Sequence, residues 1–384
     1  MGFIYNKLNF LPQIINHMKK TSLVVALLIV STSAYNAQIR KTGLLFDDAA
    51  YKAVPMIEKP LGFGDNLPKR VSLKSYVPKI GDQGDMGTCV GWASTYNVAS
   101  MEFAILTSRM NRNDISAWVY DPLYTYMNII PEEGGDYKEC VDGTYLDDAC
   151  EFIVNNDTKR KEIDETSCGN IPNWERTNAL VDFTDYYRLF NMYTDRDETI
   201  ESVCYALSLN HPVLFGMNLP ITFFSVGSDG VFVSNNSNDL RGGHAMAVVG
   251  YDDEKLGGCF TVVNSWGENW GDDGFVYIKY DDFYRYTSYG FCFEAELKPT
   301  VGVENGCMYG NCQSGYGVAK VKGNGTFEGY FSGGKMGKGI YMNLTKKGGK
   351  GGTRYIKKLA KKNGGTLIYD GYDYKKPIGV TTSY

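Results

Sequence analysis

The stretch Val262-Val-Asn-Ser-Trp-Gly-Glu-Asn-Trp-Gly-Asp-Asp-Gly-Phe-Val-Tyr-Ile278 joins two apolar runs through a centre rich in glycine and tryptophan. The runs are typical of strands, and the centre predicts the turn between them. Asn264 stands where the first strand ends. An Asn side chain there can accept a hydrogen bond from an imidazole and orient the ring, while a neighbouring Trp keeps water off that bond. The stretch therefore predicts a histidine partner for Asn264.

Three histidines are candidates for that partner. His17 lies in an N-terminal stretch that we expect to be removed. His211 leads through a proline into an apolar strand, and we interpret it as structural. His244 lies in Gly242-Gly-His-Ala-Met-Ala-Val-Val-Gly-Tyr251, where a strand follows it and two glycines leave room around the ring. His244 is therefore the predicted partner and the candidate base.

Cys89 closes the polar, glycine-rich turn Gly81-Asp-Gln-Gly-Asp-Met-Gly-Thr-Cys89, and an apolar-periodic stretch follows it. This pattern predicts a helix that begins at about Cys89. A thiol at a helix N-terminus lies near unsatisfied N–H groups and the positive end of the dipole, which favour the thiolate nucleophile. The alternative is a small buried residue at a helix start. A thiolate also needs a base, and the order Cys, His, Asn matches a known catalytic constellation.

Together these segments resemble the papain-like cysteine peptidases over residues 66–298. The matching motifs are Gln83-Gly84, Gly87-Thr88-Cys89, Gly243-His244-Ala245, Asn264-Ser265-Trp266-Gly267, Trp270-Gly271 and Gly274, with a weaker match at Asp142-Gly143-Thr144. The Asn-Ser-Trp-Gly block is the most specific of them. The separation of about 155 residues between the cysteine and the histidine slightly exceeds the family's expected range, so modest insertions are expected.

The resemblance implies an α+β fold of two lobes, with a helical left lobe that carries the cysteine and an antiparallel β-barrel right lobe that carries the histidine and asparagine. This agrees with the local patterns. Helices are predicted at 89–108, 146–154 and 197–209, and strands at 212–217, 245–251, 259–264 and 274–280.

The implied activity is that of a cysteine-type endopeptidase, which needs a protein or peptide substrate and no cofactor or metal. The residues carried over are Cys89 as nucleophile, His244 as acid and base, Asn264 as the group that orients the ring, Gln83 as an oxyanion donor, Trp266 as cover, and Gly143, Gly87 and Gly243 as substrate-binding positions. The alternative is a catalytically impaired papain-like binding protein whose tail contacts a surface or a polyanion.

Two departures from the family pattern stand out. Met86 and Val90 occupy the positions where the family usually has a cysteine and a tryptophan, and Trp92 follows two positions later. A disulfide beside the nucleophile is therefore not expected. A long helical pro-region is also missing ahead of Leu67, so latency would need another mechanism.

The N-terminus has the pattern of an export signal. Lys19 and Lys20 precede the apolar run 23–30, and small residues follow. We expect a signal peptide over 1–37 with a true start at Met18, then a short linker or pro-segment over 38–65, and an exported protein in the periplasm, on the cell surface or outside the cell. The alternative is a buried N-terminal helix.

Nine cysteines are an odd number for an exported chain. In an oxidising compartment we expect up to four bridges and one free thiol. Cys307 and Cys312 are close enough in sequence to close a small loop, whereas spacing does not indicate the other pairings. The alternative is that most of the cysteines are buried free thiols.

The tail differs from the rest of the chain in charge and in glycine content. Residues 300–384 hold 14 basic and 4 acidic residues, a charge of +10, against −15 for the first 299. Repeated Gly and aromatic residues predict β-hairpins that resemble a degenerate MORN repeat over 299–384. Its basic segment 346–362 is interpreted as a solvated surface, as a contact for an anionic surface or polyanion, or as a docking site for the acidic catalytic part. The overall charge of −5 disfavours nucleic acid as a partner, and the sequence does not indicate an oligomeric state.

Overall fold

The computed structural model describes residues 40–60, 62–64, 66–116, 118–130, 139–156, 158, 168–169, 180–192, 195–236, 238–303, 306–321, 325–343, 366–369 and 377–382. The predicted signal peptide and the basic segment 346–362 lie outside these residues. In the described part of the chain, no helix combines the length and apolar character needed to cross a membrane.

The central helix begins where the sequence predicts. It runs through α3 (Cys89–Gly91), a π-helical stretch η2 (Trp92–Ala99) and α4 (Ser100–Leu106). The other helices are α2 (Asp48–Ala53), α5 (Arg112–Ser116), α6 (Pro122–Ile129), α7 (Leu146–Asn155), α8 (Arg196–Ser208) and α9 (Tyr280–Tyr286), with 3-10 turns η1 (Lys74–Tyr76), η3 (Ile221–Ser225) and η4 (Lys255–Gly257). The predicted helices 146–154 and 197–209 are thereby confirmed as α7 and α8.

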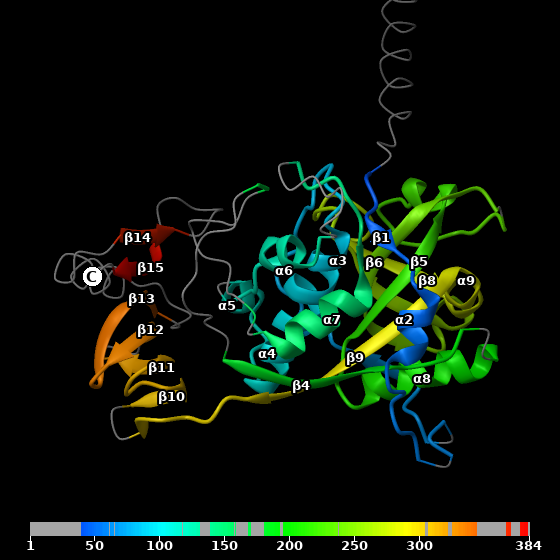
Figure 1. Ribbon diagram of the computed structural model, residues 1–384. Helices are drawn as coiled ribbons and strands as arrows, with labels where there is room; N and C mark the ends of the chain where they lie inside the picture. Colours follow the sequence, from blue (N-terminus) through cyan, green and yellow to red (C-terminus); the bar gives the residue numbers. More distant parts are fainter. Residues whose placement is uncertain are drawn as a thin grey trace, which may run out of the picture. The chain divides into compact units, whose positions relative to one another are not determined.

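A nine-stranded sheet packs against these helices (Figure 1). Its strands are β1 (Leu44–Leu45), β2 (Arg70–Ser72), β3 (Thr144–Tyr145), β4 (Val181–Arg188), β5 (Val213–Pro220), β6 (Leu240–Asp252), β7 (Cys259–Val263), β8 (Phe275–Lys279) and β9 (Thr287–Leu297). Except for the parallel pair of β1 with β3, the strand pairs are antiparallel. The long strand β6 lies at the centre, because β1, β2, β5 and β7 all pair with it.

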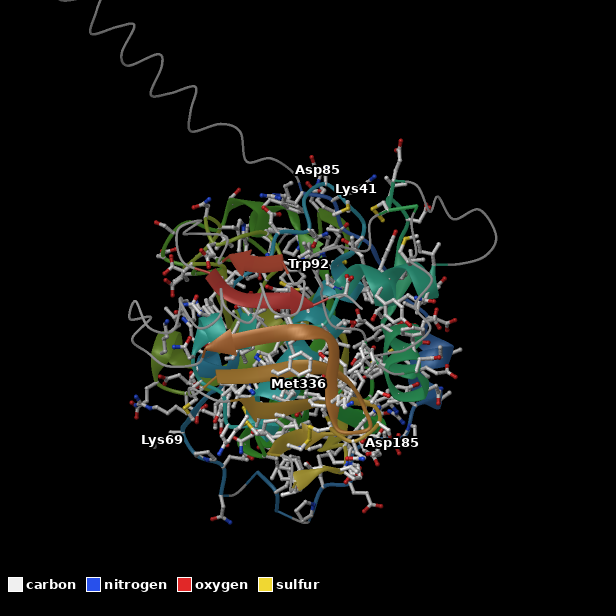
Figure 2. All side chains as sticks on the ribbon, turned by 90° about the vertical axis from the view of Figure 1, so that its left-hand side faces the viewer. Lys41, Lys69, Asp85, Trp92, Asp185 and Met336 are labelled. Carbon is white, nitrogen blue, oxygen red and sulfur yellow. A yellow bond between two sulfur atoms is a disulfide. The ribbon has the colours of Figure 1, made fainter. Side chains whose placement is uncertain are left out.

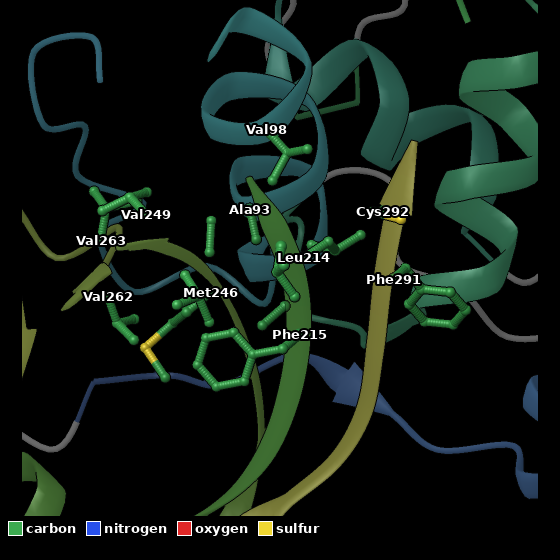
Figure 3. Packing of buried hydrophobic residues seen from close by; sticks show 14 of the residues in the cluster. Ala93, Val98, Leu214, Phe215, Met246, Val249, Val262, Val263, Phe291 and Cys292 are labelled. Atoms are coloured by element: carbon green, nitrogen blue, oxygen red, sulfur yellow. The ribbon is translucent and has the colours of Figure 1, made fainter. Parts of the chain in front are cut away.

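The core joins the central helix to this sheet. Figure 3 shows Ala93 and Val98 of the helix beside Leu214 of β5, with Met246 and Val262 from the neighbouring strands. All five side chains belong to one buried cluster. Burying such side chains stabilises the fold by about 1.5–3 kcal/mol for each large residue, so the helix start and strand β6 are held in a fixed relation.

A second sheet follows the first along the chain. Its six antiparallel strands are β10 (Cys307–Gly310), β11 (Tyr316–Val321), β12 (Gly325–Ser332), β13 (Lys335–Asn343), β14 (Thr366–Tyr369) and β15 (Pro377–Thr382). The sequence-based prediction of a small hairpin domain at the C-terminal end is confirmed in these residues. Tyr309, Tyr316 and Val318 of this sheet pack against the main core.

All nine cysteines lie in the described residues, and four of them form two disulfides, Cys140–Cys168 and Cys307–Cys312. The small loop predicted for the second pair is therefore confirmed. The prediction of a single free thiol is wrong, because five cysteines are unpaired and buried. These cysteines project from helices and strands into the core, where a free cysteine packs as a small apolar residue.

Candidate active site

Two loops are joined backbone to backbone at the site. The amide of Gln83 donates to the carbonyl of Ser265 at 2.8 Å, and the amide of Gly267 donates to the carbonyl of Gly81 at 2.9 Å. Gly267 has a φ of +82°, a left-handed conformation that favours glycine. This pairing brings the loop before Cys89 into contact with the loop that carries Asn264.

His244 and Asn264 form the pair that the sequence predicts. His244 lies on β6 and Asn264 directly after β7, and these strands are neighbours in the sheet. The imidazole Nε2 and Asn264 Oδ1 are 2.8 Å apart, and the amide of Ser265 also donates to that oxygen at 2.8 Å. The ring of Trp266 lies 4.9 Å from the imidazole, centroid to centroid. The bond to Asn264 fixes Nε2, whereas the other nitrogen, Nδ1, is buried without a hydrogen-bond partner. Nδ1 is therefore available to bond a second group.

Cys89 stands at the first position of α3 and is fully buried. Its sulfur accepts a hydrogen bond from the amide of Gly43 at 3.3 Å. The backbone N–H of Ala245, the residue after His244, also stabilises the thiolate. The helix start and the histidine strand therefore meet at this sulfur.

In this closed arrangement both groups are neutral at pH 7. Burial raises the pKa of the Cys89 thiol to about 11, although the nearby backbone N–H groups of Ala245 and Gly43 lower it. Burial also lowers the pKa of His244 to about 4, against the opposing effect of the bond to Asn264. The expected thiolate is therefore not the form present here, because the cost of removing the charge from water exceeds the help of the helix start.

Gln83 is buried beside the thiol's helix and is held at both ends of its amide. Its Oε1 accepts from the Ser265 hydroxyl at 2.7 Å, which fixes Nε2 as the donor end. Nε2 donates to the carbonyl of Met86 at 2.8 Å and to that of Lys41 at 3.3 Å. Gln83 Nε2, the predicted oxyanion donor, is therefore already bonded to a carbonyl oxygen of the N-terminal segment, that of Lys41. Ser265, which positions this amide, was not singled out from the sequence, although it stands inside the Asn-Ser-Trp-Gly block.

The three predicted substrate-binding glycines all lie against residues 43–46. A Cβ added to Gly243 would lie 2.4 Å from the carbonyl oxygen of Leu44, and one added to Gly143 would lie 2.9 Å from the Leu45 side chain. Gly87 approaches Gly43 so closely that a Cβ on Gly43 would lie 1.8 Å from the Gly87 carbonyl oxygen. These glycines therefore line a strip that already holds a peptide chain.

That chain is strand β1, which lies between the two lobes (Figure 1). Leu44 pairs with Thr144 of β3 on one side and with Gly243 of β6 on the other. The amide of Thr144 donates to the carbonyl of Gly43 at 2.8 Å. In Figure 2, Lys41 and Asp85 appear at the same edge of the molecule, in agreement with the bond from Gln83 to Lys41. This placement was not predicted from the sequence, because residues 43–46 carry no local pattern that marks them.

Two further residues complete the surroundings. Trp92 packs against Gly81, because a Cβ added to this glycine would lie 1.9 Å from the indole ring. The tryptophan therefore supports the loop that carries Gln83. Cys168, bridged to Cys140, places its sulfur 3.4 Å from that of Met86. A disulfide therefore lies near the site after all, but it does not involve the position of Met86.

His211 is not part of the site. Its Nδ1 lies 3.3 Å from Glu102 Oε1, in a pair between the end of the helical lobe and the start of β5. The hydrogen bond to Glu102 raises the pKa of His211, which agrees with the structural role predicted for this residue. Within the described residues, no group of three or more His, Cys, Asp or Glu side chains is arranged to hold a metal ion.

Comparison with known proteins agrees with this geometry. Residues 67–290 match the family described as papain family cysteine protease. The chain is 28% identical over 220 residues to cysteine endopeptidase RepA of Oryza sativa subsp. japonica, covering 56% of this chain and 53% of that protein. It is 27% identical over 253 residues to cysteine proteinase RD21A of Arabidopsis thaliana, covering 63% and 48%. The chain therefore spans about half the length of these relatives.

Solved structures show the same fold. Xylellain, a cysteine protease from Xylella fastidiosa, superimposes with a TM-score of 0.52 at 22% identity, over 68% of this chain and 99% of that one. The procathepsin B S9 of Trypanosoma congolense gives a TM-score of 0.50 at 15% identity, over 67% and 87%. The two-lobed papain-like fold predicted for this sequence is thus confirmed. With the family match covering more than half of its length, the chain belongs to the papain family of cysteine proteases.

Proposed function

We propose that the chain is an endopeptidase in which Cys89 attacks the peptide carbonyl and His244 transfers the protons. The observation that carries this proposal is the His244–Asn264 bond of 2.8 Å, which leaves Nδ1 as the free nitrogen of a buried ring. A ring held in this way can exchange a proton with a thiol at the start of α3. The Asn contact also favours the charged imidazole over the neutral one.

The reaction begins when the strip beside Cys89 is open to substrate. Water and substrate then replace the apolar cover, so the penalty on charge falls and proton transfer from Cys89 to His244 becomes favourable. The thiolate attacks the carbonyl carbon, and the negative charge that develops on oxygen is stabilised by the Gln83 amide and the Cys89 backbone N–H. Losing one donor of this kind typically costs about 2.7–4 kcal/mol.

The imidazolium then protonates the leaving amine, and an acyl-enzyme remains on Cys89. His244 next takes a proton from water, which attacks the acyl carbon and releases the acid. Asn264 keeps the imidazole in one orientation through both steps, and Trp266 shields the His244–Asn264 hydrogen bond from water. The alternative of an impaired binding protein finds no support in the comparisons, since the relatives that the chain resembles are described as a cysteine endopeptidase and a cysteine proteinase.

The test is peptide hydrolysis by the Cys89→Ala variant, assayed before and after limited proteolysis so that a closed site does not hide activity. We expect activity in the treated parent chain and none above background in the variant. Hydrolysis that survives the substitution would contradict the assignment. The Cys259→Ala variant is a matched control, because Cys259 is also a buried free cysteine but lies on β7.

Two further proposals come from the sequence and concern export and the basic tail. We propose export through the N-terminal signal, and a role for the basic tail with its MORN-like hairpins in contact with an anionic surface. Secretion of the full-length chain, compared with a variant whose apolar run 23–30 carries two charges, tests the first. Salt-dependent binding to anionic vesicles by the full chain tests the second.

A further inference from the structure

Strand β3, which follows Gly143, is bonded to an extended peptide chain. Leu44 of β1 pairs with Thr144 of β3, and the amide of Thr144 donates to the carbonyl of Gly43 at 2.8 Å. A strand that pairs with one extended segment can offer the same N–H and C=O groups to another. We therefore expect β3 to take the main chain of a peptide substrate once residues 41–46 are removed.

Hydrogen bonds and a disulfide hold the loop that precedes β3. The hydroxyl of Tyr126 on α6 donates to the carbonyl of Asp142 at 2.8 Å. The amide of Gly87 donates to the carbonyl of Cys140 at 2.8 Å, and Cys140 is bridged to Cys168. Within the described residues no disulfide joins this loop to the one that ends at the nucleophile, because the partner of Cys140 is Cys168. Non-covalent contacts therefore set the distance between the two loops.

Tyr126 reaches from the helix of the nucleophile to this loop, and its side chain is fully buried. At its base it packs against Gly91 of α3, where an added Cβ would lie 3.2 Å from the Tyr126 Cβ and 2.3 Å from the carbonyl oxygen of Pro122. At its tip the hydroxyl bonds the carbonyl that directly precedes Gly143. One aromatic side chain thus connects a position two residues after Cys89 with the start of β3.

Helix α6, which carries Tyr126, is itself fixed to the central helix (Figure 1). The Asp121 side chain caps the start of α6. The Thr95 hydroxyl of η2 donates to the Thr125 hydroxyl of α6 at 2.7 Å, and both side chains are fully buried. The location of the Tyr126 ring is therefore set by the same helix that begins at the nucleophile.

We propose that Tyr126 is a positioning residue that sets the distance between the Cys89 sulfur and the substrate main chain on β3. It acts through the Asp142 carbonyl and the strand that follows, not on the reacting atoms. Without the hydroxyl, the carbonyl loses this donor and the loop shifts to recover the lost bond, so β3 offers its N–H and C=O groups at the wrong distance. The inference rests on the proposed role of Cys89.

The first experiment compares two substrates in Tyr126→Phe, after limited proteolysis has removed residues 41–46 from the site. A peptide substrate extends along β3, whereas 4-nitrophenyl acetate reaches only the thiol and the imidazole. We expect KM for the peptide to rise about 10-fold with kcat within about threefold of the parent, and ester hydrolysis to stay within about twofold. An unchanged peptide KM, or equal losses for both substrates, would overturn the proposal.

Tyr251→Phe is the matched control. Tyr251 is also buried, and its hydroxyl also donates to a backbone carbonyl, that of Pro68, at 2.6 Å. The lost bond should lower the thermal midpoint of this variant, but its peptide KM should stay at the parent value. An equal rise in KM would mean that the loss of any such bond weakens substrate binding, and it would contradict a positioning role.

A second variant guards against a Tyr126→Phe chain that folds poorly. In Thr125→Val the side chain keeps a similar shape, but α6 loses its bond to the Thr95 hydroxyl. Helix α6 should then hold the Tyr126 ring less firmly, so the peptide KM should rise at least about twofold while ester hydrolysis keeps the parent rate. A peptide KM equal to that of the parent would rule out positioning through α6.

The second experiment measures binding without hydrolysis. Calorimetry gives the affinity of the same peptide for Cys89→Ala and for Cys89→Ala/Tyr126→Phe, both treated by limited proteolysis. We expect about 10-fold weaker binding in the double variant, and equal affinities would overturn the proposal. Binding that depends on Tyr126 in a chain that hydrolyses neither substrate would reject the proposed function and leave the positioning role intact.

Discussion

Two histidines of the described residues, the fully buried His244 and the partly exposed His211, are each bonded to one side-chain oxygen, yet their pKa values move in opposite directions. His244 bonds to the neutral amide of Asn264, and burial lowers its pKa to about 4. His211 bonds to the carboxylate of Glu102, and that bond raises its pKa. The difference shows that the hydrogen bond to a neutral amide is too weak to offset the burial of the ring, whereas the hydrogen bond to a carboxylate outweighs burial and favours the charged ring.

This contrast suits two different tasks. A ring that must take up and release a proton during each turnover needs an orientation that does not depend on its charge. A ring that joins two parts of the fold gains from a positive charge opposite a carboxylate. The first task fits the strip beside Cys89, and the second fits the junction between α4 and β5.

The largest expected effect is the loss of proton transfer in His244→Ala. We expect kcat/KM for a peptide substrate to fall by at least about 1,000-fold per folded molecule, in line with the contribution of a positioned acid or base. The assay uses protein in which limited proteolysis has removed residues 41–46 from the site. His211→Ala should retain kcat/KM within about threefold per folded molecule, and equal losses in the two variants would remove the contrast.

The next effect concerns stability. His211→Ala leaves the Glu102 carboxylate, which is 3% exposed, without its partner, and breaking a buried pair in this way costs about 3–5 kcal/mol. Urea denaturation should show a loss toward the lower end of that range, because the His211 side chain is 31% exposed. In the double variant Glu102→Gln/His211→Ala most of the loss should be recovered, and a double variant as unstable as the single one would contradict the pairing.

The sequence predicted His244 and its partner because the relevant residues sit in short local patterns. Asn264 ends a strand, two glycines precede His244, and a glycine-rich turn precedes Cys89. The neighbouring strands β6 and β7 then bring His244 and Asn264 together. Their positions in the sequence were therefore enough to predict the pair. The same holds for the helices that begin at 146 and 196, whose apolar periodicity survives in the fold.

The position of residues 43–46 beside Cys89 and the pairing of Glu102 with His211 could not be predicted in this way, because both depend on contacts between residues far apart in sequence. Gly43 is 46 residues from Cys89, and His211 is 109 from Glu102. A segment such as Gly43–Phe46 has no period of its own, and Glu102 sits in a helix where a charged residue normally faces water. Pairing of Cys140 with Cys168 is also invisible to spacing.

A smaller effect should follow from removing the oxygen that orients His244. In Asn264→Ala the imidazole N–H loses a buried acceptor, which costs about 1–3 kcal/mol, so kcat/KM should fall by about 10–100-fold. Steady-state kinetics over a range of pH checks the result. Asn264→Asp sharpens the contrast, because a carboxylate there should raise the pKa of His244 as Glu102 does for His211, and an unchanged pH profile would contradict this reasoning.

The smallest effect is a change in how stability depends on pH. In the parent the raised pKa of His211 means that its contribution is complete below about pH 6.5 and is lost as the pH rises through the folded value. The pKa of Glu102 is raised by burial as well, so both groups lower stability as the pH rises. In Glu102→Gln the main cause of the His211 shift is gone and burial lowers its pKa, with Glu294 as the weakest opposing charge.

The His211 contribution in Glu102→Gln should then reverse its sign, being present above pH 6.5 and lost as the pH falls. Urea denaturation at pH 5.5 and pH 8 should show the reversal as a change in the sign of the stability difference between the two pH values. The double variant Glu102→Gln/His211→Asn supplies the baseline for all other titrating groups. If subtracting that baseline leaves the parent's downward slope in Glu102→Gln, then something other than the carboxylate charges His211, and the two histidines differ only in their burial.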